Sequence, residues 1–254
     1  MKLLSDNLSY QFLKRLYNDP TQLKMNGNTY AGKSKLDVLM PAEFWNDITG
    51  KVVIDFGCGE GREAIEIAKR GADRVVGIDN RQRVLEAASA LAEDVGLQDR
   101  CVFTSNNDVR ADVVVSIDSF EHFSDPREIL LIMSRLLKPG GNVWISFGPT
   151  WYHPLGGHLF SVFPWAHIVF SEQSLIRWRS DFKNDGATSF GTVAGGLNKM
   201  TISQFERLVA ESPFAIEWLK LVPIRAARHF WTPLTREFFT SVVQCKLTVP
   251  RLTI

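Results

Sequence analysis

The sequence has few cysteines and almost no excess charge. Its three cysteines, Cys58, Cys101 and Cys245, are odd in number, widely spaced and outside any Cys-x-x-Cys motif, which does not suggest a disulfide framework. A reducing compartment, the cytoplasm, is therefore the expected location. Lys and Arg nearly balance Asp and Glu, leaving a formal net charge of +1. No basic excess indicates a nucleic-acid partner, and none is expected.

Long apolar runs are also missing. No stretch approaches the 18 residues that a membrane-spanning helix needs, and the N-terminal segment 1–17 is interrupted by charged residues, unlike a signal peptide. Residues 159–170 form the longest apolar candidate, but they lack the basic face of an interfacial helix, so a pocket wall is expected there. We expect a soluble protein whose 254 residues bury one full core with an elaboration.

A third absence concerns glycine spacing. Residues 52–56 are typical of a buried strand, and Gly57, Gly59 and Gly61 follow them. The dinucleotide-binding fingerprint Gly-x-Gly-x-x-Gly would need a glycine at position 62, which is Arg62. Glycines at alternate positions allow a sharp turn and let a ligand lie against bare peptide groups, next to the free N–H groups that begin the following helix. The stretch predicts a nucleotide-like cofactor.

The motif that is present resembles the first motif of class I S-adenosylmethionine (SAM)-dependent methyltransferases of the type 11-like kind. In that family an acid, here Asp55, precedes Gly-x-Gly-x-Gly. A second carboxylate, Asp79, stands where the family binds both ribose hydroxyls, and the strand 111–117 leads into a third matching element, 118–122. The resemblance covers about residues 51–149 and implies SAM as cofactor. A Rossmann domain with another nucleotide chemistry is the alternative.

The predicted cofactor site extends beyond these motifs. The segment between strands three and four is short, and within it Asn107 and Asp108 are the candidates for the contact with the adenine amino group. Cys58, between two motif glycines, is expected to be a small filler and not a nucleophile. The full predicted set combines the turn, the acids and nearby polar residues: Asp55, Gly57, Cys58, Gly59, Gly61, Asp79, Asn80, Asn107, Asp108 and Asp118.

Hydrophobic periodicity predicts the remaining elements. Leu4, Leu8, Phe12 and Leu16 indicate an amphipathic helix that could cap the site, followed by a polar connector over 18–37. Asp125 with Pro126 and Glu128 indicates a capped helix start. The alternation predicts helices at 62–70, 81–95, from 125 and at 201–211, and strands from 51 and at 73–79, 101–106, 111–117, 142–147, 215–222 and 241–249.

These elements define an α/β fold class: a Rossmann-like, seven-stranded, mostly parallel sheet with helices on both faces and an antiparallel last strand. Residues 1–50 are predicted to form an N-terminal helical cap, and 51–254 the SAM-binding methyltransferase domain. Within it, the insertion 148–200 after strand five is rich in aromatics and holds His153, His158 and His167. It leaves the carboxyl end of a strand, where open sheets bind ligands, so we expect a substrate cover whose aromatics are mostly structural. His167 is expected to be a core histidine.

The catalytic candidates are His158, His122, Glu121 and His153. The sequence Asp118-x-x-Glu121-His122, with His158 beyond strand five, also resembles the Glu-x-x-Glu-His cluster of metal-dependent O-methyltransferases, such as the ubiquinone-pathway and small-RNA 3′-end enzymes. That resemblance implies a divalent cation such as Mg2+ held by Asp118, Glu121, His122 and His158. Without a metal, one of the histidines becomes the candidate general base.

The expected function is SAM-dependent methyl transfer to a small, partly apolar acceptor, with a phenolic hydroxyl as the favoured nucleophile because the cover is aromatic. C- or N-methylation of another hydrophobic metabolite is the main alternative. A cofactor-binding partner subunit without catalysis, and an RNA methyltransferase, complete the alternatives. The sequence does not indicate the oligomeric state.

Overall fold

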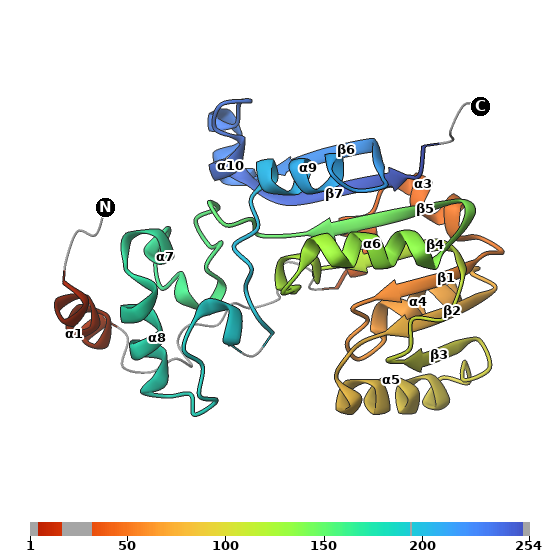
Figure 1. Cartoon of the computed structure of the whole chain (residues 1–254), viewed down its shortest axis with the longest axis horizontal. Helices are drawn as coiled ribbons and strands as arrows, with labels where there is room; N and C mark the ends of the chain where they lie inside the picture. Colours follow the sequence, from red (N-terminus) through yellow and green to blue (C-terminus); the bar gives the residue numbers. More distant parts are fainter. Residues whose placement is uncertain (1–4, 17–31, 194, 251–254) are drawn as a thin grey trace.

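The computed structural model describes residues 5–16, 32–193 and 195–250. These residues are organised around one seven-stranded sheet (Figure 1). The strand order is β3-β2-β1-β4-β5-β7-β6, and β7 runs antiparallel to both of its neighbours while the pairs among β1 to β5 are parallel. The predicted sheet is confirmed. The strands are β1 (Val52–Phe56), β2 (Arg74–Ile78), β3 (Cys101–Thr104), β4 (Ala111–Ile117), β5 (Leu137–Phe147), β6 (Ala215–Pro223) and β7 (Thr240–Thr248).

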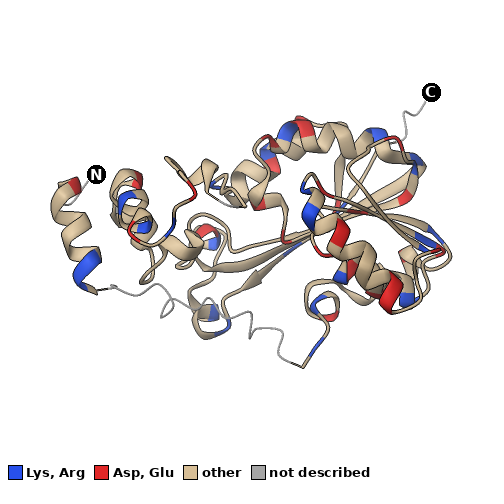
Figure 2. Cartoon of the chain, turned by 90° about the horizontal axis from the view of Figure 1, so that it is seen from below, with Lys and Arg blue, Asp and Glu red and all other residues tan. Residues whose placement is uncertain are grey.

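Helices cover both faces of the sheet, as predicted. One face packs against α6 (Pro126–Leu136) and α9 (Ile202–Ala210), and the other against α2 (Lys35–Leu39), α3 (Ala42–Ile48), α4 (Arg62–Lys69) and α5 (Gln82–Asp94). Central strands bury both faces: in β1, Ile54 and Phe56 belong to the first core and Val53 to the second. Lys and Arg alternate with Asp and Glu over the helices seen in Figure 2.

Helix α6 begins as its sequence predicts. The Asp125 carboxylate accepts a hydrogen bond from the Glu128 amide at 3.1 Å, and Pro126 occupies the first turn. The helix ends at Leu136, earlier than its apolar stripe suggests, because Leu137 already pairs with Ala111 as the first residue of β5. Tertiary pairing with β4 therefore sets this boundary.

Two short helices before β1 have no counterpart in the predictions. The connector expected to reach Asp37 ends earlier, because the Ser34 side chain caps α2 by accepting from the Asp37 amide. Leu36 and Phe44 are fully buried in the core with α4. The connector residues 18–31 and Leu4 lie outside the described part of the chain.

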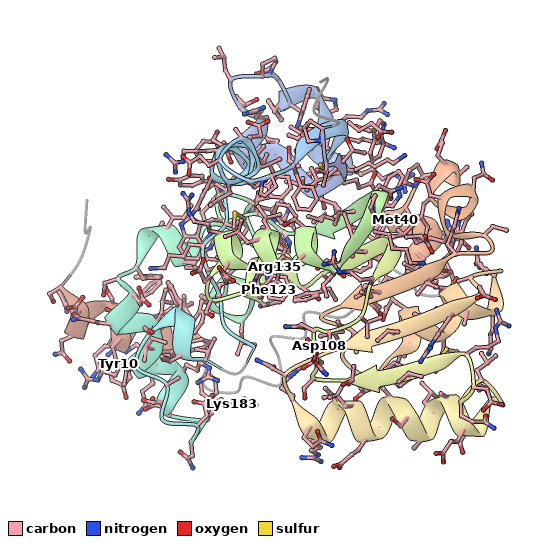
Figure 3. The ribbon with its side chains drawn as sticks, turned by 45° about the vertical axis from the view of Figure 1, so that its right-hand side comes forward. Tyr10, Met40, Asp108, Phe123, Arg135 and Lys183 are labelled. Carbon is pink, nitrogen blue, oxygen red and sulfur yellow. The ribbon has the colours of Figure 1, made fainter. Side chains whose placement is uncertain are left out.

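A separate lobe contains α1 (Asp6–Leu16), the 3-10 turns at His158–Phe160 and Phe190–Thr192, α7 (Ala166–Val169) and α8 (Glu172–Ser180). Its own core includes Leu13, Phe160, Trp178 and Phe190, and Figure 3 shows Tyr10 and Lys183 in this lobe, apart from Met40 beside the sheet. The expectation that most insertion aromatics are structural agrees with this packing.

Helix α1 does form, but it does not bury the face that its spacing indicates. Leu8, Phe12 and Leu16 are 58%, 45% and 47% exposed, and α1 instead packs Leu13 and Tyr10 against the insertion. The Tyr10 hydroxyl donates to Asp181 at 2.9 Å, and the Arg177 guanidinium lies 4.0 Å from the Tyr10 ring centre. These contacts attach α1 to α8. Its role as a cap over the site remains a prediction.

The 3-10 turn Arg225–Phe230 and helix α10 (Arg236–Phe239) connect β6 to β7. Pro223 pairs with Thr240, and Phe147, the last residue of β5, pairs with Val243. The connection therefore lies at the end of the sheet where β5 has its carboxyl end. Phe230, Leu234 and Phe238 are exposed on it, Leu234 to 94%. No helix among the described residues is long and apolar enough to cross a membrane.

Gly77 in β2 provides a sharp test of the packing beside the turn. A Cβ atom there would lie 2.4 Å from the Phe103 ring and 2.9 Å from Cys58 Sγ, so Gly77→Ala should destabilise the fold by about 1–3 kcal/mol through overpacking. Thermal and urea unfolding measure this. Phe103→Leu should restore part of the loss in the double variant, and Gly191→Ala, where the nearest atom would be 3.9 Å away, serves as the control. Equal stability of Gly77→Ala and the native chain would contradict this packing.

Candidate functional site

The candidate site lies where the strand order reverses, between β1 and β4 at their carboxyl ends. The chain leaves β1 through Gly57, Gly59 and Gly61, with φ angles of +85°, +51° and +75°, which residues with side chains rarely adopt. The Gly57 and Cys58 amides both donate to the Ile78 carbonyl, at 2.8 and 3.1 Å. The turn is thereby bound to the end of β2 and opens directly into α4.

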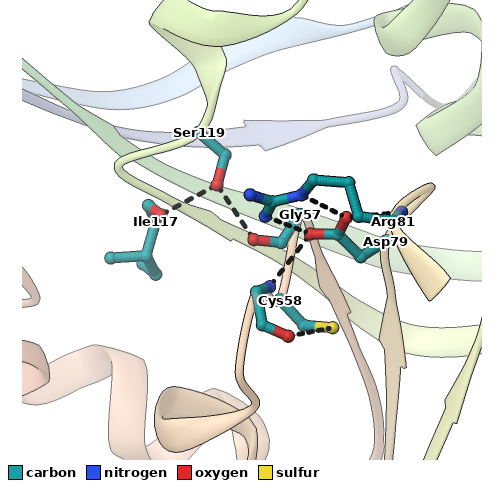
Figure 4. A network of polar contacts seen from close by, with 7 residues as sticks. Gly57, Cys58, Asp79, Arg81, Ile117 and Ser119 are labelled. Atoms are coloured by element: carbon teal, nitrogen blue, oxygen red, sulfur yellow. Dashed lines mark hydrogen bonds and ion pairs between the residues drawn. The ribbon is translucent and has the colours of Figure 1, made fainter. Parts of the chain in front are cut away.

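Neighbouring side chains fill the space beside this turn. A Cβ on Gly57 would lie 2.7 Å from Ser119 Oγ, and one on Gly61 would lie 2.6 Å from the Phe103 ring. Ser119 Oγ is within hydrogen-bond distance of the Gly57 and Ile117 carbonyls, at 3.1 and 3.0 Å (Figure 4). Ser119 therefore joins the turn after β1 to the end of β4.

Asp79 follows β2, as predicted, and its carboxylate is buried. Oδ2 accepts from the Gly59 amide at 3.1 Å, and both oxygens accept from Arg81, whose Nε and Nη2 lie 2.9 Å away (Figure 4). Burial raises the pKa of Asp79, but the hydrogen bonds and charge of Arg81 outweigh it and lower that pKa. Asp79 is an ionised acceptor near neutral pH.

A second group of charges lies on the other side of the turn. Lys35 Nζ from α2 is 3.1 Å from Asp118 Oδ2 and 3.3 Å from Glu63 Oε1. Asp55 is buried beside it, and its Oδ2 has no hydrogen-bond partner. Burial, and then the Glu63 charge, raise the pKa of Asp55 to about 8, although Lys35 opposes them. Lys35 pairs with Glu63 and Asp118, and its own pKa is raised because these two carboxylates outweigh burial.

The other predicted cofactor residues are placed differently. Cys58 is buried, and burial raises its thiol pKa, as expected of a filler. Asn80, Asn107 and Asp108 are exposed; Figure 3 shows Asp108 beyond the strand ends on the side that faces the insertion. Their part in cofactor binding remains a prediction.

A histidine and carboxylate cluster lies beyond β4 and β5. Glu121, His122 and His158 offer ligand atoms that all lie within 4.8 Å of one another. His122 Nδ1 donates to the Gly196 carbonyl at 2.8 Å, which leaves the lone pair on its Nε2. Asp118, the fourth predicted metal ligand, is absent from this group because its carboxylate pairs with Lys35.

Two members of the cluster have buried atoms without partners. Glu121 Oε2 and His158 Nε2 make no hydrogen bond, which is rare for buried polar atoms in native proteins. Burial, and then the Asp118 charge, raise the pKa of Glu121 to about 8, whereas burial and the nearby His122 lower that of His158 to about 4. The cluster fits a ligand that satisfies both atoms, and a divalent cation is one such ligand.

Backbone geometry supports the special status of this region. Of the described residues other than glycine, Asp118, His158, Trp165 and Lys199 have positive φ angles, of 47°, 51°, 66° and 60°. Such conformations cost free energy and gather at ligand sites. Two of the four, Asp118 and His158, belong to the predicted site.

The other two insertion histidines are held by protein groups. His167 Nε2 donates to the Trp151 carbonyl at 2.7 Å, and its Nδ1 lies 2.8 Å from Ser161 Oγ. The prediction of a satisfied core histidine is confirmed for His167. His153 Nδ1 accepts from the Leu155 amide at 2.9 Å, and burial lowers its pKa to about 4. This bond uses the lone pair that a general base would need.

A small cavity adjoins the cluster, with a volume of about 120 Å3. His122 and His158 line it together with the buried Arg179, which pairs with Asp185. The remaining walls are largely apolar: Gly157, Leu159, Phe160, Val193, Gly196 and Leu197. The cavity therefore combines an apolar body with a polar end, as small-molecule sites commonly do.

Three residues of the site escaped the sequence reasoning. Lys35 comes from a helix that was not predicted, and Arg81 adjoins a motif acid without being part of any pattern. Asn198 ties the insertion to the segment after β4: its Nδ2 donates to the Phe120 and Phe123 carbonyls at 2.8 and 2.9 Å. A lone Asn in an irregular segment gives no sequence signal, whereas Arg81 could be noticed from its distance of two residues to Asp79.

An open sheet with a glycine turn and two acids at its switch point is the arrangement of the class I SAM-dependent methyltransferases, as the motifs predicted. The Methyltransferase domain family matches residues 33–217. The chain belongs to that family. The predicted cofactor, SAM, agrees with this membership.

Individual relatives agree on the class but differ in their acceptors. The chain is 39% identical over 105 residues to the ribosomal protein L11 methyltransferase of Photobacterium profundum, covering 39% of this chain and 34% of that protein. It is 33% identical over 123 residues to the ubiquinone biosynthesis O-methyltransferase of Aliivibrio fischeri, covering 46% and 51%. The matches thus span a third to a half of these relatives.

The fold is also similar to solved structures. An S-adenosylmethionine-dependent methyltransferase from Mesorhizobium loti superposes with a TM-score of 0.52 at 16% identity, over 89% of this chain and 99% of the other. At that identity the likeness is one of fold. It includes the seven-stranded sheet that positions the site.

The raised pKa of Asp55 predicts a pH dependence of stability. A carboxyl whose pKa is about 8 in the folded chain and 3.8 in the unfolded chain favours folding below pH 3.8. That contribution is lost as the pH rises toward 8. Between pH 5 and 8, the ionisation of Asp55 should lower the unfolding free energy of the native chain by up to about 1.4 kcal/mol per pH unit. In Asp55→Asn this part of the slope should be absent. Urea unfolding at several pH values measures the slope; Asp94→Asn, at an exposed site, should leave it unchanged. An unaltered slope in Asp55→Asn would refute the shift.

Proposed function

We propose that this chain transfers the methyl group of SAM to a hydroxyl of a small, partly apolar acceptor bound in the cavity beside His122 and His158. The observation that carries the proposal is the buried His158 Nε2, which has no hydrogen-bond partner and belongs to a residue that lines a largely apolar cavity. Phe230, Leu234 and Phe238, exposed at the same sheet edge, also suit an acceptor with apolar parts. SAM, when bound, supplies a methyl group on a sulfonium sulfur that leaves as a neutral thioether.

The residues around the glycine turn would bind the cofactor. Asp79 offers the carboxylate for the ribose hydroxyls, and the turn 57–61 offers bare peptide for close approach. Lys35 lies among Asp55, Glu63 and Asp118 on the other side of the turn. The Lys35 ammonium group is placed to attract the carboxylate of the cofactor, while the surrounding acids attract the amino group of the cofactor.

The chemistry asked of the protein is alignment and proton removal. As the acceptor oxygen forms its bond to the methyl carbon, its proton has to leave, and His158 Nε2 is a buried nitrogen of the cluster without a hydrogen-bond partner. Because burial lowers the pKa of His158 to about 4, the imidazole is neutral at physiological pH and has a lone pair to offer. The lobe above the site excludes water from the reacting atoms.

Glu121, His122 and His158 would hold a divalent cation if the enzyme uses one. A bound cation would lower the pKa of an acceptor hydroxyl. Two imidazoles and one carboxylate suit Mn2+ or Zn2+ better than Mg2+, which prefers an oxygen shell. Asp118, the fourth predicted ligand, pairs instead with Lys35 through Oδ2 at 3.1 Å.

A protein acceptor is the second candidate, because the L11 methyltransferase relatives bear that activity in their name. The cavity volume of about 120 Å3 would admit one small side chain. C- or N-methylation of a hydrophobic metabolite uses the same cavity without a need for hydroxyl deprotonation.

A panel of phenols, amines and peptides, with the products identified by mass spectrometry, separates these acceptor classes. Transfer restricted to amines or carbon atoms would remove the O-methyl proposal.

Paired variants separate cofactor binding from chemistry. Asp79→Asn should weaken SAM binding by about 10- to 100-fold, because hydrogen bonds to the ionised carboxylate are lost. His158→Asn should leave SAM binding within about twofold and lower kcat by about 100- to 10,000-fold, the usual contribution of a general base. Calorimetry and initial rates measure the two effects, with Asp94→Asn, at the exposed end of α5, as control. Full turnover in His158→Asn would contradict the assigned role.

The cation is tested by direct binding. Calorimetric titration of the metal-free protein with Mn2+, Zn2+ and Mg2+ should show one site whose affinity falls at least tenfold in Glu121→Gln and in His122→Asn. Glu172→Gln, outside the cluster, is the control. Equal affinity in all variants would mean that the cluster binds no metal, and His158 would then act as a base alone.

A further inference from the structure

The Asp79 carboxylate has no acceptor position left for a ribose. Oδ1 accepts from the Arg81 amide at 3.0 Å and from Arg81 Nε at 2.9 Å, while Oδ2 accepts from the Gly59 amide at 3.1 Å and from Arg81 Nη2 at 2.9 Å. An ionised carboxylate has about four lone-pair positions. All four are used by protein donors, so vicinal hydroxyls cannot bind unless some of these donors leave.

The four donors differ in how easily they can leave. Those from Gly59 and Arg81 N are backbone groups fixed by the turn and by the start of α5. The other two belong to a guanidinium whose side chain is 59% exposed, against 5% for Asp79. That guanidinium also lies over the turn, with Nη2 3.9 Å from the position of a Cβ on Gly59. The Arg81 side chain thus covers both surfaces that a ribose would contact.

We propose that the Arg81 side chain closes the ribose site of the free protein and has to swing into solvent when the cofactor binds. Its departure frees one acceptor position on Oδ1 and one on Oδ2, which matches the two vicinal hydroxyls of a ribose. The two backbone donors stay and keep the carboxylate oriented. Arg81 therefore lowers cofactor affinity and favours ligands with both hydroxyls. This inference rests on the proposed SAM site.

The ion pair between Arg81 and Asp79 is weak enough for a ligand to displace the Arg81 side chain reversibly. The guanidinium is largely exposed, so water and salt screen its attraction to the buried Asp79 carboxylate. A ligand that replaces two charge-assisted hydrogen bonds by two hydroxyl bonds can therefore displace it. Removing the guanidinium should tighten binding by about 2- to 5-fold. A neutral ligand with the same ribose should bind the native chain more tightly as salt weakens the ion pair.

The test compares Arg81→Gln with Arg83→Gln. Arg83 lies two residues along on α5, is exposed, and has no ion pair among the described residues, so the control removes the same charge from the same helix. Calorimetry with SAM and with neutral adenosine should show about 2- to 5-fold tighter binding in Arg81→Gln only. The gain should shrink for 2′-deoxyadenosine, which lacks one hydroxyl. Adenosine affinity should rise between 50 and 500 mM NaCl in the native chain and stay flat in Arg81→Gln.

Unchanged or weaker adenosine binding in Arg81→Gln, with a normal unfolding curve, would overturn the inference, because the guanidinium would then be neutral to binding or a positive contact. An equal gain in Arg83→Gln would overturn it as well, since the effect would be one of net charge. If the native chain and Arg81→Gln both bind neither SAM nor adenosine, the proposed function itself fails. Loss of binding in Asp79→Asn alongside no change in Arg81→Gln would leave that function standing and remove only the role of Arg81.

Discussion

The hydrogen bond from the Gly59 amide to the Asp79 carboxylate is the constraint on which the site depends. It spans 3.1 Å between the turn after β1 and the residue after β2, and its donor is a backbone N–H, which every residue except proline would carry at position 59. The conformation that points this amide at Asp79 has a φ of +51° at Gly59 and positive φ at Gly57 and Gly61, which makes glycine the suitable residue. Strand pairing, the turn and the acid are therefore one unit, and Ser119 extends that unit to β4.

The sequence predicted this unit well because its signals are local. Asp55, the three glycines and Asp79 lie within 25 residues, and the strands around them bury both faces, so an apolar run followed by glycines was sufficient. The N-cap at Asp125 was equally local and was found. Helix α1 shows the limit: its i+4 stripe predicts a helix, but burial of Tyr10 and Leu13 instead of Leu8 and Phe12 depends on α8, more than 150 residues away.

The same distinction explains which site residues were missed. Lys35 reaches Asp118 only because α2 packs against α4, and Asn198 reaches the carbonyls of Phe120 and Phe123 across the insertion. Neither contact leaves a pattern in the chain. The cluster was predicted with four ligands, and the structure brings Glu121, His122 and His158 together while Lys35 holds Asp118. Lys35, which no sequence pattern indicated, thus determines the partner of Asp118, which the sequence did indicate.

The separation of the three hydrophobic cores has a consequence for how such a chain can diversify. Two cores belong to the sheet and its helices, while the third consists of residues from α1 and the insertion alone. Mutations that reshape the third core can therefore accumulate without loosening the platform that holds the nucleoside. Related proteins could therefore change acceptor specificity through substitutions in this lobe, while the sheet that binds the methyl donor stays unchanged.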